Sequence, residues 1–369
     1  MTPLEKAEAF QPLDRPDLIA LLSIPAGNET DRLFAAARKR RDELLGRKVY
    51  FRGLVELSNV CIKNCYYCGI RRDNHKIRRY TMSDDEIVSG ALRAWKMGLG
   101  SVVLQSGERS DPAFADMIER VLLRIVSETG GELGITLSLG EQTEETYRRW
   151  LKAGARRYLL RIEEADPNLY AQLHPSDHSW SARRECLRLL QTCGYQTGTG
   201  VMCGLPGQTM DNLADDLLFM KRLDADMIGM GPYLPHPDTP LASRLSEFEK
   251  NSTELLFLGL KMIACARLLM PDVNIASTTA LQTIRPDGRE LGLLAGANVI
   301  MPNVGTESRK KEYNLYTGKP DLEDSPELIL DRITAAVESI GCEISLREPG
   351  DPRHFFVRTG RTDGRAHSA

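Results

Sequence analysis

Short apolar runs alternate with longer amphipathic stretches along most of the chain, and no short repeat or low-complexity block interrupts them. The short runs are typical of strands, whereas the longer stretches carry apolar residues at helical spacing. The predicted strands cover residues 49–57, 101–105, 134–139, 158–161, 196–202, 227–230, 274–277 and 298–301.

Helix signals lie between the predicted strands. One stretch begins at Ser83 and has Glu86 three positions on, which is the pattern of a capping box. Gly154 ends a second helical stretch and Thr209 begins a third. About eight strand–helix units in a row favour an α/β protein of the parallel (βα)8 TIM-barrel type, with an open parallel sheet as the alternative.

The two ends of the chain differ from this pattern. Residues 1–48 are expected to form a helical extension that caps the bottom of the barrel. Residues 49–348 would be the barrel domain. Residues 349–369 are rich in glycine and arginine and are expected to form a flexible tail.

Composition removes several classes of function. The 48 basic and 51 acidic residues give a net charge of −3, which lacks the basic excess of nucleic-acid binders. No run approaches the roughly 18 apolar residues of a membrane helix. Charges and prolines interrupt the N-terminal apolar positions, so we expect no signal peptide and a cytoplasmic location, with no membrane partner.

Three of the eight cysteines, Cys61, Cys65 and Cys68, form a C-x3-C-x2-C motif just after the first predicted strand. Three thiolates can hold three irons of a cubane and leave the fourth iron open. A zinc site is the alternative. Structural zinc usually has four ligands, and His75 could supply the fourth. The other five cysteines are scattered and are expected to be small buried apolar residues.

The motif, with Tyr67 before its last cysteine, resembles the radical S-adenosylmethionine (SAM) superfamily. The resemblance implies one 4Fe–4S cluster on the three cysteines, with SAM chelating the open iron. It also implies that electron transfer cleaves SAM to a 5′-deoxyadenosyl radical. The cofactors carry that chemistry, and we expect no catalytic side chain beyond them.

Eight segments in order resemble, more narrowly, the HydE family of FeFe-hydrogenase maturases. They are LSNVCIKNCYYCGIRRDN, VVLQSGE, TLSLGE, AGARRYLLRIE, VMCGLPGQT, GMGPYLPHPDTPLA, STTALQTIRPDGRE and GANVIMPN, within residues 48–318. This resemblance implies a role in assembling the hydrogenase active-site cluster from an iron carbonyl cyanide cysteine complex. It implies HydG and HydF as partners, and ferredoxin or flavodoxin as electron donor.

The resemblance also implies contacts to SAM from residues near strand ends, where barrel enzymes place their chemistry. Arg183 would pair with the carboxylate of SAM, in preference to its neighbour Arg184. Glu163 would face the amine and ribose, and a leucine would pack on adenine. The full set is Tyr67, Ser106, Gly107, Glu108, Ser138, Glu163, Arg183 and Leu205.

Polar residues predicted to face the barrel interior are candidates to hold an anionic substrate. A buried arginine needs an anionic partner, and Arg161 is expected to point inward at the end of the fourth strand. An ion pair of Arg161 with Glu163 or Glu141 is the structural alternative. The candidate set is Gln105, Thr136, Arg161, Thr278, Thr279, Tyr313 and Tyr316.

The chain departs from some HydE proteins in one respect. These carry a second cluster on three further cysteines beyond the last barrel strand, whereas residues 316–337 contain no cysteine here. Cys342 alone cannot hold a cluster, so we expect only one.

Two other functions remain open at this stage. One is a different biotin-synthase-like radical SAM enzyme, such as a methylornithine synthase. The other is a non-catalytic iron–sulfur or zinc carrier, which would need neither Glu163 nor Arg183.

Overall fold

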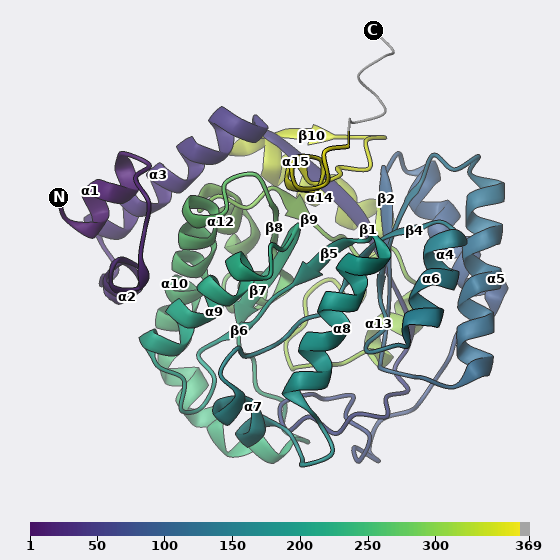
Figure 1. Cartoon of the computed structure of the whole chain (residues 1–369). Coiled ribbons are helices and arrows are strands. Elements are labelled where there is room, and N and C mark those ends of the chain that lie inside the picture. Colours follow the sequence, from purple (N-terminus) through teal and green to yellow (C-terminus); the bar gives the residue numbers. More distant parts are fainter. Residues whose placement is uncertain (362–369) are drawn as a thin grey trace, which may run out of the picture.

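Eight parallel strands close into a barrel in the computed structural model, which describes residues 1–361 except the side chains of residues 244–247, 249, 307 and 308 (Figure 1). The strands pair in the order β1-β2-β3-β4-β5-β7-β8-β9, and β9 pairs back with β1 through Tyr50–Val299 and Phe51–Ile300. Because an open sheet has no pairing between its first and last strands, this closure confirms the predicted (βα)8 barrel.

The strands match most of the predicted ranges. Two short strands are additional: β6 pairs with β7, and β10 pairs with the start of β1. The bounds are β1 Lys48–Ser58, β2 Ser101–Ser106, β3 Gly134–Ser138, β4 Ala155–Leu159, β5 Gln196–Thr199, β6 Met202–Cys203, β7 Met227–Pro232, β8 Asn274–Ser277, β9 Val299–Ile300 and β10 Glu343–Ser345.

The fourth strand begins earlier than predicted and ends at Leu159 rather than at Arg161. Its register is fixed by Arg157, which lies opposite Thr136 of β3 and donates to its hydroxyl at 2.9 Å. The predicted strand at 196–202 is also interrupted, at Gly200. A Cβ there would lie 1.9 Å from the carbonyl oxygen of Gly229, so the two strands approach too closely for a side chain.

Helices cover the outside of the barrel, and the predicted caps are confirmed. The Ser83 and Glu86 side chains form a capping box, and Thr209 forms another with Asn212. The bounds are α1 Pro3–Glu8, α2 Arg15–Ser23, α3 Asn28–Leu45, α4 Asp84–Lys96, α5 Pro112–Glu128, α6 Glu144–Lys152, α7 Pro167–Leu173, α8 Trp180–Cys193, α9 Met210–Arg222, α10 Leu245–Leu269, α11 Thr279–Ile284, α12 Gly288–Leu294, α13 Glu307–Glu312, α14 Pro326–Ser339 and α15 Arg353–Thr359, with a 3-10 turn at Pro240–Arg244.

The N-terminal helices do not cap the bottom of the barrel as expected. They pack against its outer side, with α3 along α10 and α2 along α9 (Figure 1). Arg15 of α2 forms ion pairs with Asp211 and Asp215 of α9 at 2.9 and 2.8 Å. Leu18, Leu21 and other apolar residues of this extension belong to the main hydrophobic core.

The C-terminal segment closes the bottom of the barrel instead. Arg52 donates to the carbonyl oxygen of Gly350, and Arg157 donates to the carbonyl oxygen of Pro349 and to Asp351. Residues 353–359 then form α15, where Arg358 pairs with buried Asp226. The expected flexible tail is therefore a packed segment up to residue 361, and the rest of the predicted tail lies outside the described residues. Within the described chain, no helix is long and apolar enough to cross a membrane.

Candidate SAM and cluster site

The three motif cysteines lie at the carboxyl end of β1, in the loop that leads to α4. Main-chain hydrogen bonds tie this loop to three distant segments. The Ile62 amide donates to the Glu108 carbonyl at 2.9 Å, Tyr66 to Leu173 at 3.0 Å, and Gly69 to Leu315 at 2.9 Å. The loop is therefore held against the ends of several strands rather than folded on itself.

The end of β2 packs directly on the first cysteine. The Gly107 amide donates to the Ser58 carbonyl, and the Glu108 amide donates to Cys61 Sγ at 3.3 Å. A Cβ on Gly107 would lie 2.4 Å from the Val60 carbonyl oxygen, so only glycine allows this approach. Ser106 ends β2, and its hydroxyl donates to the Gly107 carbonyl at 2.6 Å. The end of β2 and the residues after it, Ser106, Gly107 and Glu108, thus border the cysteine loop. The sequence predicted these three residues as SAM contacts near a strand end.

Four charged side chains meet beside Cys61. Arg183, in the first turn of α8, contacts Glu108 at 2.9 Å and Glu141 at 3.2 Å. Lys63, from the cysteine loop, contacts Glu141 at 2.9 Å and Glu108 at 3.3 Å. Arg183 also donates to the Arg161 carbonyl. The neighbouring Arg184 is exposed and lies over the Trp180 ring, which supports the choice of Arg183.

Burial and charge act differently on the two glutamates. Desolvation raises the pKa of Glu108, although Arg183 and Lys63 oppose it. Burial also disfavours the charged form of Glu141, but Arg183 and Lys63 outweigh it and hold the pKa of Glu141 below its ordinary value. When ionised, the four groups carry two positive and two negative charges. A zwitterionic ligand can therefore bind by replacing some of their mutual ion pairs with contacts to its own charges.

Glu163 lies beyond the end of β4 rather than at its end, which corrects the predicted position. Its backbone has φ 69° and pairs with Val201 in an isolated bridge. Its carboxylate contacts Arg161 at 3.1 Å, and Arg161 also donates to the Val201 carbonyl at 2.7 Å. Because β4 ends at Leu159, Arg161 lies outside the strand, and the alternation of strand side chains does not set its direction. Its contact with Glu163 is the ion pair that was given as the alternative. Positive φ in a non-glycine residue is uncommon and is often found at functional sites.

An apolar wall stands next to the cysteine loop. Leu205 is buried in a cluster with Leu169, Leu173 and Tyr233, and Tyr67 packs on this cluster. The Tyr67 hydroxyl hydrogen-bonds His174 Nε2 at 3.0 Å. Burial lowers the pKa of His174 to about 4, so its ring is neutral. Such a wall suits the flat face of a base such as adenine. Ser138 is half-buried at the end of β3.

The donor set fits an iron–sulfur cluster by its chemistry. All three thiols are free and half-buried, and the charge of Cys61 acts on Cys65 while both act on Cys68. Burial raises the pKa of Cys65 to about 12, and Cys61 adds to this rise. In the described part of the chain, no three His, Cys, Asp or Glu side chains are arranged closely enough to hold a metal ion. The fit therefore rests on three soft thiol ligands in one loop, beside the Glu108 amide and Arg183.

The candidate substrate residues fall into two groups. Five of them, with Arg161, lie near the carboxyl ends of the strands. Gln105 Nε2 donates to the Tyr313 hydroxyl at 3.3 Å, and Thr279 accepts from Arg289 at 3.2 Å. Thr278 directly follows β8 and donates to the Met230 carbonyl. Burial raises the pKa of Tyr316 to about 12.

Thr136 belongs to the opposite end of the barrel. Its hydroxyl is held by Arg157, and it lines a cavity of about 30 Å³ together with Arg52, Met227 and Asn274. That volume has room for only one or two waters. The structure therefore does not bring Thr136 together with the other candidates.

Sequence reasoning missed three charged residues at this end of the barrel: Glu56, Lys319 and Lys63. Glu56 of β1 is buried and contacts Lys319 at 2.5 Å, and Asn303 donates to it at 2.8 Å. Lys319 also lies 5.6 Å from the Tyr313 ring centre. No local signal could reveal this pair, because its members are 263 residues apart. Lys63, by contrast, lies inside the motif and could have been noticed.

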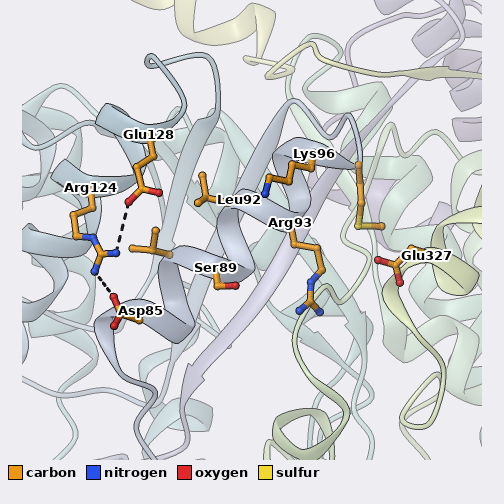
Figure 2. A pocket seen from close by; sticks show the side chains of 10 residues that line it. Asp85, Ser89, Leu92, Arg93, Lys96, Arg124, Glu128 and Glu327 are labelled. Carbon is orange, nitrogen blue, oxygen red and sulfur yellow. Dashed lines mark hydrogen bonds and ion pairs between the residues drawn. The ribbon is translucent and has the colours of Figure 1, made fainter.

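A separate hollow of about 470 Å³ lies on the outer surface (Figure 2). Its walls come from α4 and α5, with Glu327 of α14 at one side. Arg124 there pairs with Asp85 at 2.7 Å and Glu128 at 3.6 Å. None of its lining residues comes from a strand end, so it is no part of the candidate site.

Comparisons with known proteins agree with this geometry. Residues 55–220 match the model of the Radical SAM superfamily. The HydE subunit of the FeFe-hydrogenase maturase from Thermotoga maritima is 44% identical over 94% of both chains. A 3-methylornithine synthase from Methanosarcina acetivorans is 30% identical over 82% of both chains.

Solved structures show the same barrel. A methylornithine synthase superposes with a TM-score of 0.78 at 25% identity, over 94% of this chain and 98% of that one. The maturase HydG from Carboxydothermus hydrogenoformans superposes with a TM-score of 0.77 at 20% identity, over 93% and 78% of the chains. The fold and the cysteine loop define a radical SAM enzyme, a class that implies a 4Fe–4S cluster and SAM. Within it, the chain belongs to the HydE family of FeFe-hydrogenase maturases.

Proposed function

We propose that this chain cleaves SAM reductively and uses the resulting 5′-deoxyadenosyl radical to build the active-site cluster of FeFe-hydrogenase. The observation that carries the proposal is the position of the C-x3-C-x2-C loop. It lies at the carboxyl end of β1 beside a balanced set of two cations and two carboxylates. When bound, a 4Fe–4S cluster on Cys61, Cys65 and Cys68 supplies the electron for cleavage.

The side chains around the loop match the parts of SAM. Its amino-acid end is a zwitterion, so Glu108 and Glu141 can receive the ammonium group while Arg183 receives the carboxylate. Glu163 offers a further carboxylate 3.1 Å from Arg161. Ser106 and Ser138 add hydroxyls, and Leu205 with Tyr67 forms the surface on which adenine would stack.

The barrel interior supports a small anionic substrate, which we propose is an iron carbonyl cyanide complex bound to cysteine. Gln105, Tyr313, Tyr316, Thr278 and Thr279 offer hydrogen-bonding groups near the strand ends. Arg161 offers positive charge from the same end, and buried Arg289 donates to Thr279. An anion there would add a partner for Arg161 and Arg289, which contact Glu163 at 3.1 Å and Asp321 at 3.5 Å. A substrate held between the strand ends and the cysteine loop would keep a radical away from water.

The remaining parts of the proposal concern the setting of the reaction. We propose a single cluster, because the loop holds three thiols and Cys342 is buried against Arg41 at 3.6 Å. We propose that HydG supplies the substrate, that HydF receives the product, and that ferredoxin or flavodoxin provides the electron. A cytoplasmic location suits thiols that must stay reduced.

Anaerobic reconstitution tests the core of the proposal. The chain is loaded with iron and sulfide, reduced with dithionite and mixed with SAM, and 5′-deoxyadenosine is measured. We expect about four irons per chain and formation of 5′-deoxyadenosine. Iron uptake without any SAM cleavage would instead support an iron–sulfur carrier, and zinc without iron would support a zinc protein.

A second candidate, formation of a methylornithine, is favoured by the likeness to 3-methylornithine synthases in both sequence and structure. The two activities separate in one experiment. The reconstituted chain is offered either amino acids, with 3-methylornithine as the readout, or HydG, HydF and apo-hydrogenase, with hydrogen production as the readout. We expect activity only in the second arm. Activity only in the first arm would overturn the maturase proposal.

A further inference from the structure

Arg79 holds the two flanks of the cysteine loop together through main-chain carbonyl groups alone. One terminal nitrogen of its guanidinium donates to Asn59 at 2.6 Å and to Ile70 at 2.8 Å. The other donates to Arg71 at 2.5 Å, Asn74 at 3.1 Å and Arg72 at 3.2 Å. Asn59 precedes the first cysteine of the loop, whereas the other four acceptors follow the last one.

No carboxylate in the described chain forms an ion pair with Arg79, which is unusual for a half-buried guanidinium. Its partners are neutral carbonyl oxygens, so its positive charge is not cancelled locally. A planar guanidinium can reach five acceptors in one fixed arrangement, whereas a lysine ammonium has only three donors on a flexible stem.

The neighbouring Arg78 gives a natural contrast. Its side chain is 81% exposed, and among the residues whose side chains are described it forms an ion pair with Glu312 at 3.5 Å. Arg78 therefore carries the same charge one residue away and does not bind the loop. Arg79, in turn, donates to the carbonyls of Asn59 and Ile70, which lie two residues from Cys61 and Cys68, so its charge is close to both ends of the cysteine motif.

We propose that Arg79 is a positioning residue for the cluster: it sets the shape of the cysteine loop before iron binds, and it places a fixed positive charge beside Cys61 and Cys68. The inference rests on the proposed cluster at this loop. Net charge near a cluster and hydrogen bonds around it tune its reduction potential, and a nearby cation favours the reduced, more negative state.

The first experiment needs no iron. Hydrogen exchange is followed by mass spectrometry in the metal-free wild-type chain and in the Arg79→Gln, Arg79→Lys and Arg78→Gln variants. We expect amides in residues 59–79 to exchange faster in both Arg79 variants, because neither side chain can bridge the same five carbonyls. Arg78→Gln should match the wild type. Equal exchange in all four proteins would overturn the positioning role. Faster exchange spread equally over β2 and β3 would also overturn it, because Arg79 would then support only the whole fold.

The second experiment measures the midpoint potential of the reconstituted cluster by a redox titration followed by electron paramagnetic resonance. We expect a shift to more negative potential in Arg79→Gln, a smaller shift in Arg79→Lys, and the smallest in Arg78→Gln. Equal shifts in Arg79→Gln and Arg78→Gln would overturn the electrostatic part. If the wild-type chain took up no iron, the proposed function would fail, whereas the exchange experiment would still decide the loop-shaping role.

Discussion

The two ends of the barrel both bury arginine side chains, but they satisfy them with different partners. At the carboxyl end of the strands, Arg183 contacts the side chains of Glu108 and Glu141, which share Lys63. At the opposite end, Arg157 and Arg52 donate to main-chain carbonyls of residues 349 and 350, and Arg157 also contacts Asp351 of the same packed segment. The Glu108 and Glu141 side chains can turn toward a ligand, whereas the main chain of the closing segment cannot. The carboxyl end of the barrel can therefore change its ion pairs when a ligand binds, whereas the opposite end is closed by a packed segment.

The largest expected effect comes from removing a ligand at the first end. Cys65→Ser should abolish iron uptake and 5′-deoxyadenosine formation, because two thiols cannot hold the three irons of the motif. Iron analysis and the cleavage assay measure this. Cys186→Ser, at a half-buried position in α8, is the matched control and should keep both properties. A variant at Cys65 with full iron content would place the cluster elsewhere.

Removing the arginine of the exchangeable network should have the next largest effect. Arg183→Gln should weaken SAM binding roughly 10- to 150-fold, which corresponds to about 1.5–3 kcal/mol for a charge-assisted hydrogen bond. Equilibrium binding to the reconstituted protein gives the dissociation constant. Arg184→Gln changes the exposed neighbour and should bind SAM as the wild type does. Equal affinities for the two variants would remove Arg183 from the SAM site.

A change at the closed end should affect stability and leave SAM binding intact. Asp351→Asn should lower the free energy of unfolding by about 1–3 kcal/mol, because it leaves Arg157 buried without its carboxylate. Urea unfolding of the metal-free chain measures the change. The exposed Asp331 of α14 provides the control variant, Asp331→Asn, which should be neutral. Weakened SAM binding in Asp351→Asn would show that the two ends are coupled.

The smallest effect concerns pH. A hydrogen bond that His354 donates to Asp272, with the nearby charges of Asp224 and Asp226, raises the pKa of His354 above its ordinary value of 6.5. The folded state therefore binds the proton more tightly than the unfolded state. This contribution, up to about 1 kcal/mol at a partly exposed site, is complete below pH 6.5 and is lost as pH rises through the raised pKa.

Urea unfolding at pH 6 and pH 8 tests this dependence. The wild-type chain should lose more stability between the two values than His354→Asn, in which the pairing with Asp272 and Asp224 is no longer ionic. Parallel pH dependence in both proteins would show that α15 does not sense pH through this histidine.

Local signals in the sequence were enough to predict much of the fold. Ser83 with Glu86 marked the start of α4, and the bounds of β8 were predicted without error. Arg157 shows where local reasoning fails. A charged residue predicts an exposed position, but this one lies inside a strand because Pro349 and Asp351, almost 200 residues later, satisfy it. The closing segment was accordingly predicted as a tail.

The residues of the candidate site also differ in whether a local sequence signal could reveal them. The cysteines and Arg183 could be singled out because each lies in a recognisable segment, and the structure places Arg183 2.9 Å from Glu108. Glu141 entered only as a possible partner of Arg161, and Lys319 was not foreseen. Their roles depend on pairing across the barrel, which no periodicity or spacing records. The strained backbone of Glu163 is likewise a property of the loop's tertiary setting.

The closure of the barrel bottom also has a consequence for the order in which a growing chain can fold. Arg52 leaves the ribosome 298 residues before Gly350, whose carbonyl oxygen accepts its hydrogen bond. The edge of β1 also lacks its partner β9 until residues 299–300 have been made, and an unpaired strand edge can associate with other chains. Strand β1 leads directly into the cysteine loop. Synthesis from the N-terminus therefore produces the three thiols early and completes the barrel around them last.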